Sequence, residues 1–306
     1  MAGSRFSHLR AILQALLVTF LWSTSWVLIK FGLRDIPPVT FAGLRYALAF
    51  AFLLPLALRS SNRQLLRRLS GRRWIELTAL GLLFYALTQG ASFVSLAYLP
   101  AMTTSLLWNL TTITVAMLGI CLLAEPLTPF QWTGVVLNLL GVLIYFHPPA
   151  LAGGQLVGLA AALVGVLANA GSSILGRSVN RRGDVNPVVV TAISMGIGAA
   201  VLLTTGLAVQ GLPPLRPEHW IIIGWLALVN TALAFTLWNR TLRSLTAVES
   251  SVINSTMLGQ IAVLAWLFLG EGLSWQKGLG LLLTALGTLM VHLRARRGRQ
   301  AVGTRT

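Results

Sequence analysis

Residues 123–132 read LAEPLTPFQW, and a related stretch, LGEGLSW, follows at residues 269–275. The two stretches align without a gap at an offset of 146 residues, which pairs Glu125 with Glu271. The same offset pairs further identical residues, among them Trp74/Trp220, Ala101/Ala247, Ser105/Ser251, Gly134/Gly280 and Gly141/Gly287. About 20 of roughly 70 aligned positions are identical, more than shared composition readily produces. The sequence therefore predicts a chain built by duplication of one unit.

The composition predicts an integral membrane protein. Of the 306 residues, 56% are hydrophobic and only 10% are charged, with a mean hydropathy of +0.78. Soluble domains carry roughly 25% charged residues, so this chain lacks the polar surface that a water-soluble fold requires. The net charge of +16 could suggest nucleic acid as a partner. However, the Arg residues come in short clusters between long apolar runs, which is typical of loops on one membrane face, so nucleic-acid binding is excluded.

Ten segments contain the roughly 20 mostly apolar residues that a helix needs to cross a bilayer. They lie near residues 9–31, 38–58, 74–98, 101–124, 129–147, 155–179, 187–210, 219–242, 246–270 and 275–293. Most Arg residues fall in the termini and in the even-numbered loops, including the basic loop 59–73 and the tail 294–306. Because basic loops stay on the cytoplasmic side, we expect both termini in the cytoplasm.

The duplicated unit holds five of these segments, so the predicted fold is all-α, with ten transmembrane helices in two five-helix repeats. The first repeat covers residues 1–150, and the second covers residues 151–306 with a basic cytoplasmic tail. Since five is odd, the second copy enters the membrane from the opposite side and the repeats are inverted. Inverted repeats are typical of carriers that work by alternating access.

Three stretches carry a resemblance to a known family. They are FLWSTSWVLIKFGL at residues 20–33, FAGLRY at residues 41–46, and the pair 123–132 and 269–275. The chain resembles the EamA-type branch of the drug/metabolite transporter superfamily over nearly its whole length. The resemblance implies ten helices in two inverted repeats and a central cavity, walled mainly by the first, third, fourth, sixth, eighth and ninth helices. Within the superfamily the sequence is most similar to bacterial exporters of aromatic amino acids.

The motifs of enzymes and ATP-driven pumps are missing from the sequence. There is no GxxxxGK[ST] phosphate loop and no HExxH pair, so we expect neither ATP binding nor hydrolysis. The seven acidic residues and four histidines all fall near helix ends or in loops. We therefore expect no enzyme, no metal site and no cofactor, with a small-molecule substrate and the lipid bilayer as the only partners.

The positions of the same acidic residues indicate how transport is driven. Proton-coupled carriers usually place a titratable side chain inside the membrane, and none lies near the middle of a predicted helix here. Transport driven by the solute gradient is therefore the economical hypothesis. Glu249 leaves one alternative open, because it could act in coupling or could form an interfacial ion pair with Arg240 or Arg243.

Polar and aromatic residues in the middle of the predicted helices are the candidates for substrate binding. Trp22 and Trp26 share one face of the first helix, since they are four residues apart. Arg45 lies about two turns inside the second helix and is either a structural anchor or a charge that attracts a substrate carboxylate. The full set is Trp22, Ser25, Trp26, Arg45, Tyr85, Gln89, Trp108, Asn109, Asn169, Ser172, Asn230 and Asn254.

Each of these residues alone also fits a contact between helices, because small and polar side chains help membrane helices to pack. Together they favour a wet cavity lined by aromatic rings, which suits amphipathic solutes. In contrast, Asn138 and the paired glycines Gly134/Gly141 and Gly280/Gly287 predict close packing between helices.

The leading hypothesis is a membrane exporter of amino acids, with aromatic and other bulky neutral ones preferred. A chain with 21 Arg and 2 Lys suggests a GC-rich bacterial genome, and hence the bacterial inner membrane. The alternative is an exporter of drugs, nucleotide sugars or other small metabolites, possibly with proton coupling. Two further classes are an open pore, which would show single-channel conductance, and a membrane sensor, which would carry an appended signalling domain. The sequence leaves a monomer and a homodimer equally open.

Overall fold

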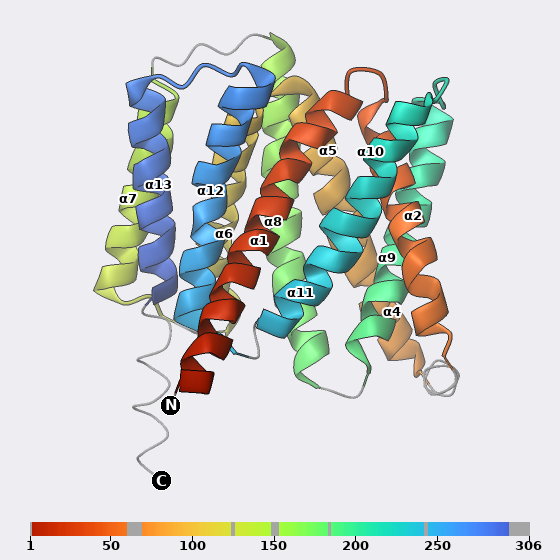
Figure 1. Cartoon of the computed structure of the whole chain (residues 1–306), viewed down its shortest axis with the longest axis horizontal. Helices are drawn as coiled ribbons and strands as arrows, with labels where there is room; N and C mark the ends of the chain where they lie inside the picture. The colour runs from red at the N-terminus through yellow and green to blue at the C-terminus, as the bar shows by residue number, and fades with distance from the viewer. Residues whose placement is uncertain are drawn as a thin grey trace. The chain divides into compact units, whose positions relative to one another are not determined.

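The structure is a computed structural model that describes residues 2–59, 69–123, 126–147, 153–182, 185–241 and 244–293. Within these ranges every regular element is a helix (Figure 1). In chain order the elements are α1 (Ala2–Gly32), α2 (Pro38–Ala57), α4 (Gly71–Leu80), η1 (Gly81–Gln89), α5 (Gly90–Tyr98), α6 (Ala101–Leu123), α7 (Pro129–Tyr145), α8 (Gly153–Arg181), α9 (Pro187–Val209), α10 (Pro217–Ala227), η2 (Leu228–Leu233), α11 (Ala234–Thr241), α12 (Ala247–Leu269) and α13 (Trp275–Leu293).

Each of the ten predicted segments coincides with a helix or an unbroken helical run of the described residues. The segment predicted near 74–98 is the run α4–η1–α5, and the segment near 219–242 is the run α10–η2–α11. The ends agree within a few residues, except that α1 begins earlier, at Ala2. The basic stretch 60–68, most of the basic loop predicted at 59–73, lies outside the described residues, as does the tail 294–306.

Seven helical runs of the described residues are long and apolar enough to cross a membrane. They are His8–Gly32, Pro38–Ala57, Gly71–Tyr98, Ala101–Cys121, Gly153–Val179, Pro187–Val209 and Val252–Leu269. The apolar helix Pro129–Tyr145 is shorter than these seven. The chain is thus a helical protein with several membrane spans, and the arrangement of ten spans in two inverted repeats stays a prediction.

Local sequence explains where many helices begin. Four of them, α2, α7, α9 and α10, start on proline, which lacks an N–H and is therefore tolerated in the first turn. Thr128 and Gln131 form a capping box at α7, and Thr246 and Glu249 form one at α12. In a capping box each side chain accepts a bond from the other residue's backbone N–H, which fixes the first turn.

Two other helices are capped from distant parts of the chain. The Gln210 side chain, at the end of α9, accepts a hydrogen bond from the backbone N–H of Val39 in α2 at 2.9 Å. The Glu271 carboxylate accepts bonds from the backbone N–H groups of Ala101 and, at 2.9 Å, Met102, at the start of α6. The exposed N–H groups of a helix start favour a negative charge, so Glu271 stabilises α6 electrostatically as well.

The chain forms two compact units, and each unit draws on both predicted repeats. Unit 1 comprises residues 1–27, 100–152 and 234–306, and unit 2 comprises residues 28–99 and 153–233. Neither unit therefore coincides with the predicted repeat 1–150 or 151–306. The repeats were predicted from sequence identity, whereas the units are defined by which residues are in contact. The units therefore do not test the repeats, which stay a prediction.

The core of unit 1 includes a very close contact between α7 and α13. A Cβ atom added at Gly287 would lie 2.5 Å from the carbonyl oxygen of Gly134, and one at Gly141 would lie 2.6 Å from that of Gly280. Between these glycines, Asn138 donates a hydrogen bond to Thr288 Oγ1 at 2.8 Å. The predicted role of the paired glycines and Asn138 in close helix packing is confirmed.

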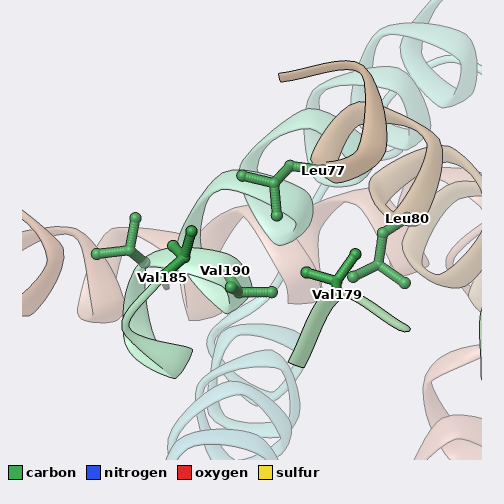
Figure 2. Packing of buried hydrophobic residues seen from close by; sticks show 6 residues of the cluster. Leu77, Leu80, Val179, Val185 and Val190 are labelled. Atoms are coloured by element: carbon green, nitrogen blue, oxygen red, sulfur yellow. The ribbon is translucent and has the colours of Figure 1, made fainter. Parts of the chain in front are cut away.

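In unit 2, α2 and α9 pack with similarly close backbones. A Cβ atom at Gly43 would lie 2.6 Å from the Cα of Leu203, and one at Gly206 would lie 2.6 Å from the Cα of Thr40. Figure 2 shows a second contact region of this unit, where buried residues from α4, from α8, from the connection between α8 and α9, and from the start of α9 meet. This cluster consists of Leu77, Leu80, Val179, Val185, Val189 and Val190. These contacts hold the helices that carry the polar residues described next.

Candidate functional site

Arg45 is a buried cation in the middle of unit 2. It lies in α2, and only 7% of its surface is exposed. Its Nη2 donates a hydrogen bond to Thr231 Oγ1 at 3.3 Å. Its Cζ lies 5.2 Å from the ring centroid of Tyr46 and 6.0 Å from that of Phe93, both within range of a cation–π interaction. Arg45 is therefore surrounded by aromatic rings and one hydroxyl group.

Two π-helical segments contact the pair Arg45 and Tyr46. Tyr85, on η1, packs edge-on against Tyr46 with 5.6 Å between ring centroids, whereas Thr231, on η2, binds Arg45. Residues 85 and 231 are equivalent under the 146-residue offset of the sequence repeat. π-Helical segments are rare and often occur at functional sites. The geometry thus makes Arg45 and Tyr46 the centre of a candidate site in unit 2.

The other candidates of unit 2 lie on η1, η2 and α8. Asn230 is fully buried next to Thr231, and Gln89 is half-buried at the end of η1. On α8, the Ser172 hydroxyl donates to the backbone oxygen of Asn169 at 2.8 Å, a contact within one helix. The structure therefore brings Tyr85 to Tyr46, the neighbour of Arg45 in α2, whereas the hydroxyl of Ser172 bonds within its own helix.

In unit 1, Trp22 belongs to an aromatic cluster. Its ring centroid lies 5.2 Å from that of Phe235 and 5.3 Å from that of Trp238, both in tilted geometry. Ser25 is buried and Trp26 is half-buried further along α1. Offset and tilted ring pairs are favourable contacts, and such rings can also stack on an aromatic ligand.

The remaining candidates of unit 1 are on α6 and α12. Trp108 is half-buried, and its buried Nε1–H has no hydrogen-bond partner among the described residues. Asn109 donates to the backbone oxygen of Ser105 at 2.9 Å and accepts a long bond from Thr288 of α13 at 3.5 Å, which is a contact between helices. Asn254 is exposed on α12.

Gln260 is a polar residue of α12 that the sequence analysis did not select. Its Oε1 accepts a hydrogen bond from Ser23 at 2.9 Å, and its Nε2 donates to Thr19 at 3.3 Å and to Thr256 at 3.1 Å. It thus joins α12 to α1 within unit 1. An amide in the middle of an apolar helix was the available signal, because such a group needs partners in a membrane.

The described carboxylates all bind partners at helix ends. Asp35 lies 3.0 Å from Nε2 of the buried His219, and Glu76 lies 2.7 Å from Arg73 and 3.0 Å from Arg182. The remaining three are Glu218 beside Arg216, Glu249 beside His8 and Thr246, and Glu271 on the first N–H groups of α6. The side chains of Arg240 and Arg243, the expected partners of Glu249, lie outside the described residues.

No group of three or more His, Cys, Asp or Glu side chains within the described residues could hold a metal ion. The candidate site of unit 2 combines aromatic rings, the Thr231 hydroxyl and the buried guanidinium of Arg45. These groups can bind an amphipathic organic molecule through stacking, hydrogen bonds and one charge.

Comparison with known proteins identifies the class of this chain. The family model of the EamA-like transporter family matches it twice, over residues 9–146 and over residues 156–293. The chain belongs to the EamA-like transporter family, which is part of the drug/metabolite transporter superfamily, and it is therefore a membrane transporter.

Several relatives are similar over almost their full length. The uncharacterized transporter YoaV of Bacillus subtilis is 25% identical over 291 residues, covering 92% of this chain and 96% of the relative. A protein of Chlamydia trachomatis named S-adenosylmethionine/S-adenosylhomocysteine transporter is 25% identical over 295 residues, covering 93% and 88%. A crystal structure with 19% identity matches with a TM-score of 0.66 over 94% of this chain and 99% of the other, which supports the fold.

Proposed function

We propose that this chain exports amphipathic solutes with an amino-acid head group, with aromatic and other bulky neutral amino acids preferred. Transport proceeds by alternating access of the two inverted repeats and follows the solute gradient. The protein lies in the inner membrane of a bacterium with both termini in the cytoplasm, as the basic loops predict.

The observation that carries the proposal is the association of aromatic rings with buried polar groups in the middle of apolar helices. In unit 1, Trp22 of α1 packs against the rings of Phe235 and Trp238 on α11, and the next residue, Ser23, donates a hydrogen bond to Gln260 of α12. Unit 2 has Tyr46 and Tyr85 beside Arg45. Rings favour a flat apolar body, and hydroxyl, amide and guanidinium groups favour a zwitterionic head.

The name of one relative supports a solute with an amino-acid head group. S-Adenosylmethionine and S-adenosylhomocysteine, named for the Chlamydia trachomatis relative, each join an α-amino acid to an aromatic adenine ring. Phenylalanine and tryptophan share this combination of a zwitterion and a ring. A transporter of S-adenosyl compounds is accordingly the second candidate function.

Counterflow into liposomes tests the proposal. The purified full-length protein is reconstituted with unlabelled phenylalanine inside, and the uptake of labelled phenylalanine is followed. We expect transient accumulation that unlabelled neutral amino acids compete away and that a proton ionophore leaves unchanged, because the described acidic residues lie at helix ends.

Three results would contradict parts of the proposal. Competition by a dicationic drug alone would favour a drug exporter, and collapse of counterflow by the ionophore would favour proton coupling. Accumulation of S-adenosylhomocysteine without any accumulation of phenylalanine would favour the second candidate. Empty liposomes are the control for passive flux.

A further inference from the structure

We infer that Arg45 is the carboxylate-binding group of a substrate subsite in unit 2, and that Thr231 of η2 is its positioning residue. The inference deepens the proposed function, since it rests on a transported solute that carries a carboxylate. It also decides between the two roles that the sequence leaves open for Arg45, a structural anchor and a substrate-facing charge.

Most N–H donors of Arg45 have no partner among the described residues. A guanidinium presents several N–H groups in a planar fork and accepts none. Within the described residues, a single bond of 3.3 Å to Thr231 uses one Nη2 donor, and the buried Nε–H has no partner. A structural anchor would be expected to satisfy most of these donors, because an unpaired buried polar group is costly.

Among the described residues, no carboxylate pairs with Arg45 as a counter-ion. The described carboxylates bind His219, Arg73, Arg182, Arg216, His8 or backbone N–H groups, and none of them pairs with Arg45. A cation inside a membrane span is expensive unless an anion or water compensates it. An anion that arrives with the substrate supplies this compensation only when it is bound.

Aromatic rings lie beside the guanidinium of Arg45. Cζ of Arg45 lies over the ring of Tyr46, 5.2 Å from its centroid, and 6.0 Å from the centroid of the Phe93 ring. A ring against the face of the guanidinium leaves its in-plane N–H groups available, and these match the two oxygens of a carboxylate. The adjoining Tyr46 and Tyr85 rings offer an aromatic wall to the rest of the solute.

Thr231 owes its position to the π-helical register of η2. Its hydroxyl donates to the backbone oxygen of Leu226, five residues earlier, at 2.8 Å. Because the hydroxyl hydrogen is used there, the oxygen of Thr231 faces Arg45 as an acceptor. The bond holds one end of the guanidinium and leaves the other donors to the ligand.

The test uses pairs of probes that differ in the carboxylate-bearing part. Phenylalanine is compared with phenethylamine, which lacks the carboxylate, and with 3-phenylpropionate, which lacks the amine. S-Adenosylhomocysteine is compared with 5′-methylthioadenosine, which lacks the amino-acid head. The readout is the ligand-induced shift in the thermal unfolding midpoint of the purified full-length protein, followed by tryptophan fluorescence, with counterflow as a second readout.

For the wild type we expect phenylalanine, 3-phenylpropionate and S-adenosylhomocysteine, which carry a carboxylate, to raise the unfolding midpoint. Phenethylamine and 5′-methylthioadenosine, which lack it, should leave the midpoint unchanged. In Arg45→Gln the apparent affinity for the carboxylate-bearing probes falls roughly 10- to 100-fold, the loss expected for hydrogen bonds to a charged group. Arg45→Lys keeps the charge but loses the fork, and Thr231→Val keeps Arg45 but loses its positioning bond, so both weaken binding by less. These two variants carry the test if Arg45→Gln does not fold.

The matched control is Arg34→Gln, which removes an exposed arginine of the same unit. It should bind every probe as the wild type does. Wild-type discrimination between carboxylate and non-carboxylate probes in all folded Arg45 variants would overturn the subsite. So would the absence of any shift in the wild type with all carboxylate-bearing probes.

The subsite and the proposed function fail in different ways. Phenylalanine counterflow that persists with unchanged probe discrimination in Arg45→Lys would refute the subsite and leave the function standing. An Arg45-dependent shift with S-adenosylhomocysteine, together with no phenylalanine transport, would support the subsite and refute the preference for aromatic amino acids.

Discussion

Glu249, at the start of α12, is the residue whose charge the structure ties most clearly to local stability. It precedes the candidate span Val252–Leu269. Its carboxylate accepts the backbone N–H of Thr246 at 2.8 Å and the hydroxyl of Thr246 at 2.9 Å, and it lies 2.9 Å from His8. The Thr246 backbone N–H is the main cause that lowers the pKa of Glu249 below its ordinary value of 4.5, followed by the Thr246 hydroxyl and His8.

This lowered pKa predicts how stability depends on acid. Since the pKa of Glu249 is lower in the folded than in the unfolded chain, its charge stabilises the fold above the ordinary carboxyl range, and the effect is lost as the pH falls through the folded pKa. We expect Glu249→Gln to unfold at a lower temperature than the wild type at pH 7, with the two midpoints converging as the pH falls below 4.5. A difference that is the same from pH 7 to pH 3 would contradict the prediction. His8→Ala should retain most of the pH dependence, because His8 is a minor cause.

At the residue scale, sequence reasoning found candidates but not their contacts. Arg45 and Tyr85 were selected because polar and aromatic groups are unusual in the middle of apolar helices. Their partners in the structure, Thr231 and Tyr46, include a residue 186 positions away, and no local pattern encodes such a pairing. Gln260 offered a local signal as an amide in an apolar helix, but no local pattern predicts its partners Thr19 and Ser23 of α1.

At the element scale, the contact between α7 and α13 predicts a strong dependence on glycine. A Cβ atom at Gly287 would lie 2.5 Å from the backbone nitrogen of Asn138 and 2.5 Å from the backbone oxygen of Gly134, so the backbones would have to separate. We expect Gly287→Ala to lower the free energy of unfolding by about 1–3 kcal/mol, the usual cost of overpacking. Unfolding in mixed detergent micelles measures this change.

The matched control is Gly278→Ala in the same helix, where an added Cβ meets no atom within 4 Å. Alanine favours a helix over glycine by up to about 1 kcal/mol, so this variant should be neutral or slightly more stable. Equal losses in both variants would indicate a general sensitivity of α13 and would refute a specific contact at Gly287.

Element positions were largely predictable, whereas π-helical character was not. Proline starts and apolar length located helices such as α2 and α9 within a few residues, because both signals act locally. The segment η1 is as apolar as the α-helix α5 that follows it, so hydropathy cannot separate π-helix from α-helix. The equivalent places of η1 and η2 in the repeat became visible only from the backbone hydrogen bonds.

At the scale of the whole molecule, duplication and packing divide the chain differently. In unit 1 the most extensive helix contact joins α7 of the first sequence half to α13 of the second, and in unit 2 it joins α2 to α9. The duplication stays a prediction, which rests on identical residues that recur at a constant offset. The sequence could not predict the units, because membership depends on which helices meet in space.

This division predicts that neither sequence half folds alone. Residues 1–150 expressed separately would expose the glycine surfaces of α2 and α7, whose partners α9 and α13 lie in residues 151–306. We expect each half alone to aggregate or be degraded, whereas the two halves produced together should co-purify and restore the thermal transition. The break falls between α7 and α8, so it leaves every described helix intact. Gly287→Leu in the second half should abolish co-purification while Gly278→Leu should preserve it, and a first half that is monodisperse and thermally cooperative by itself would refute the prediction.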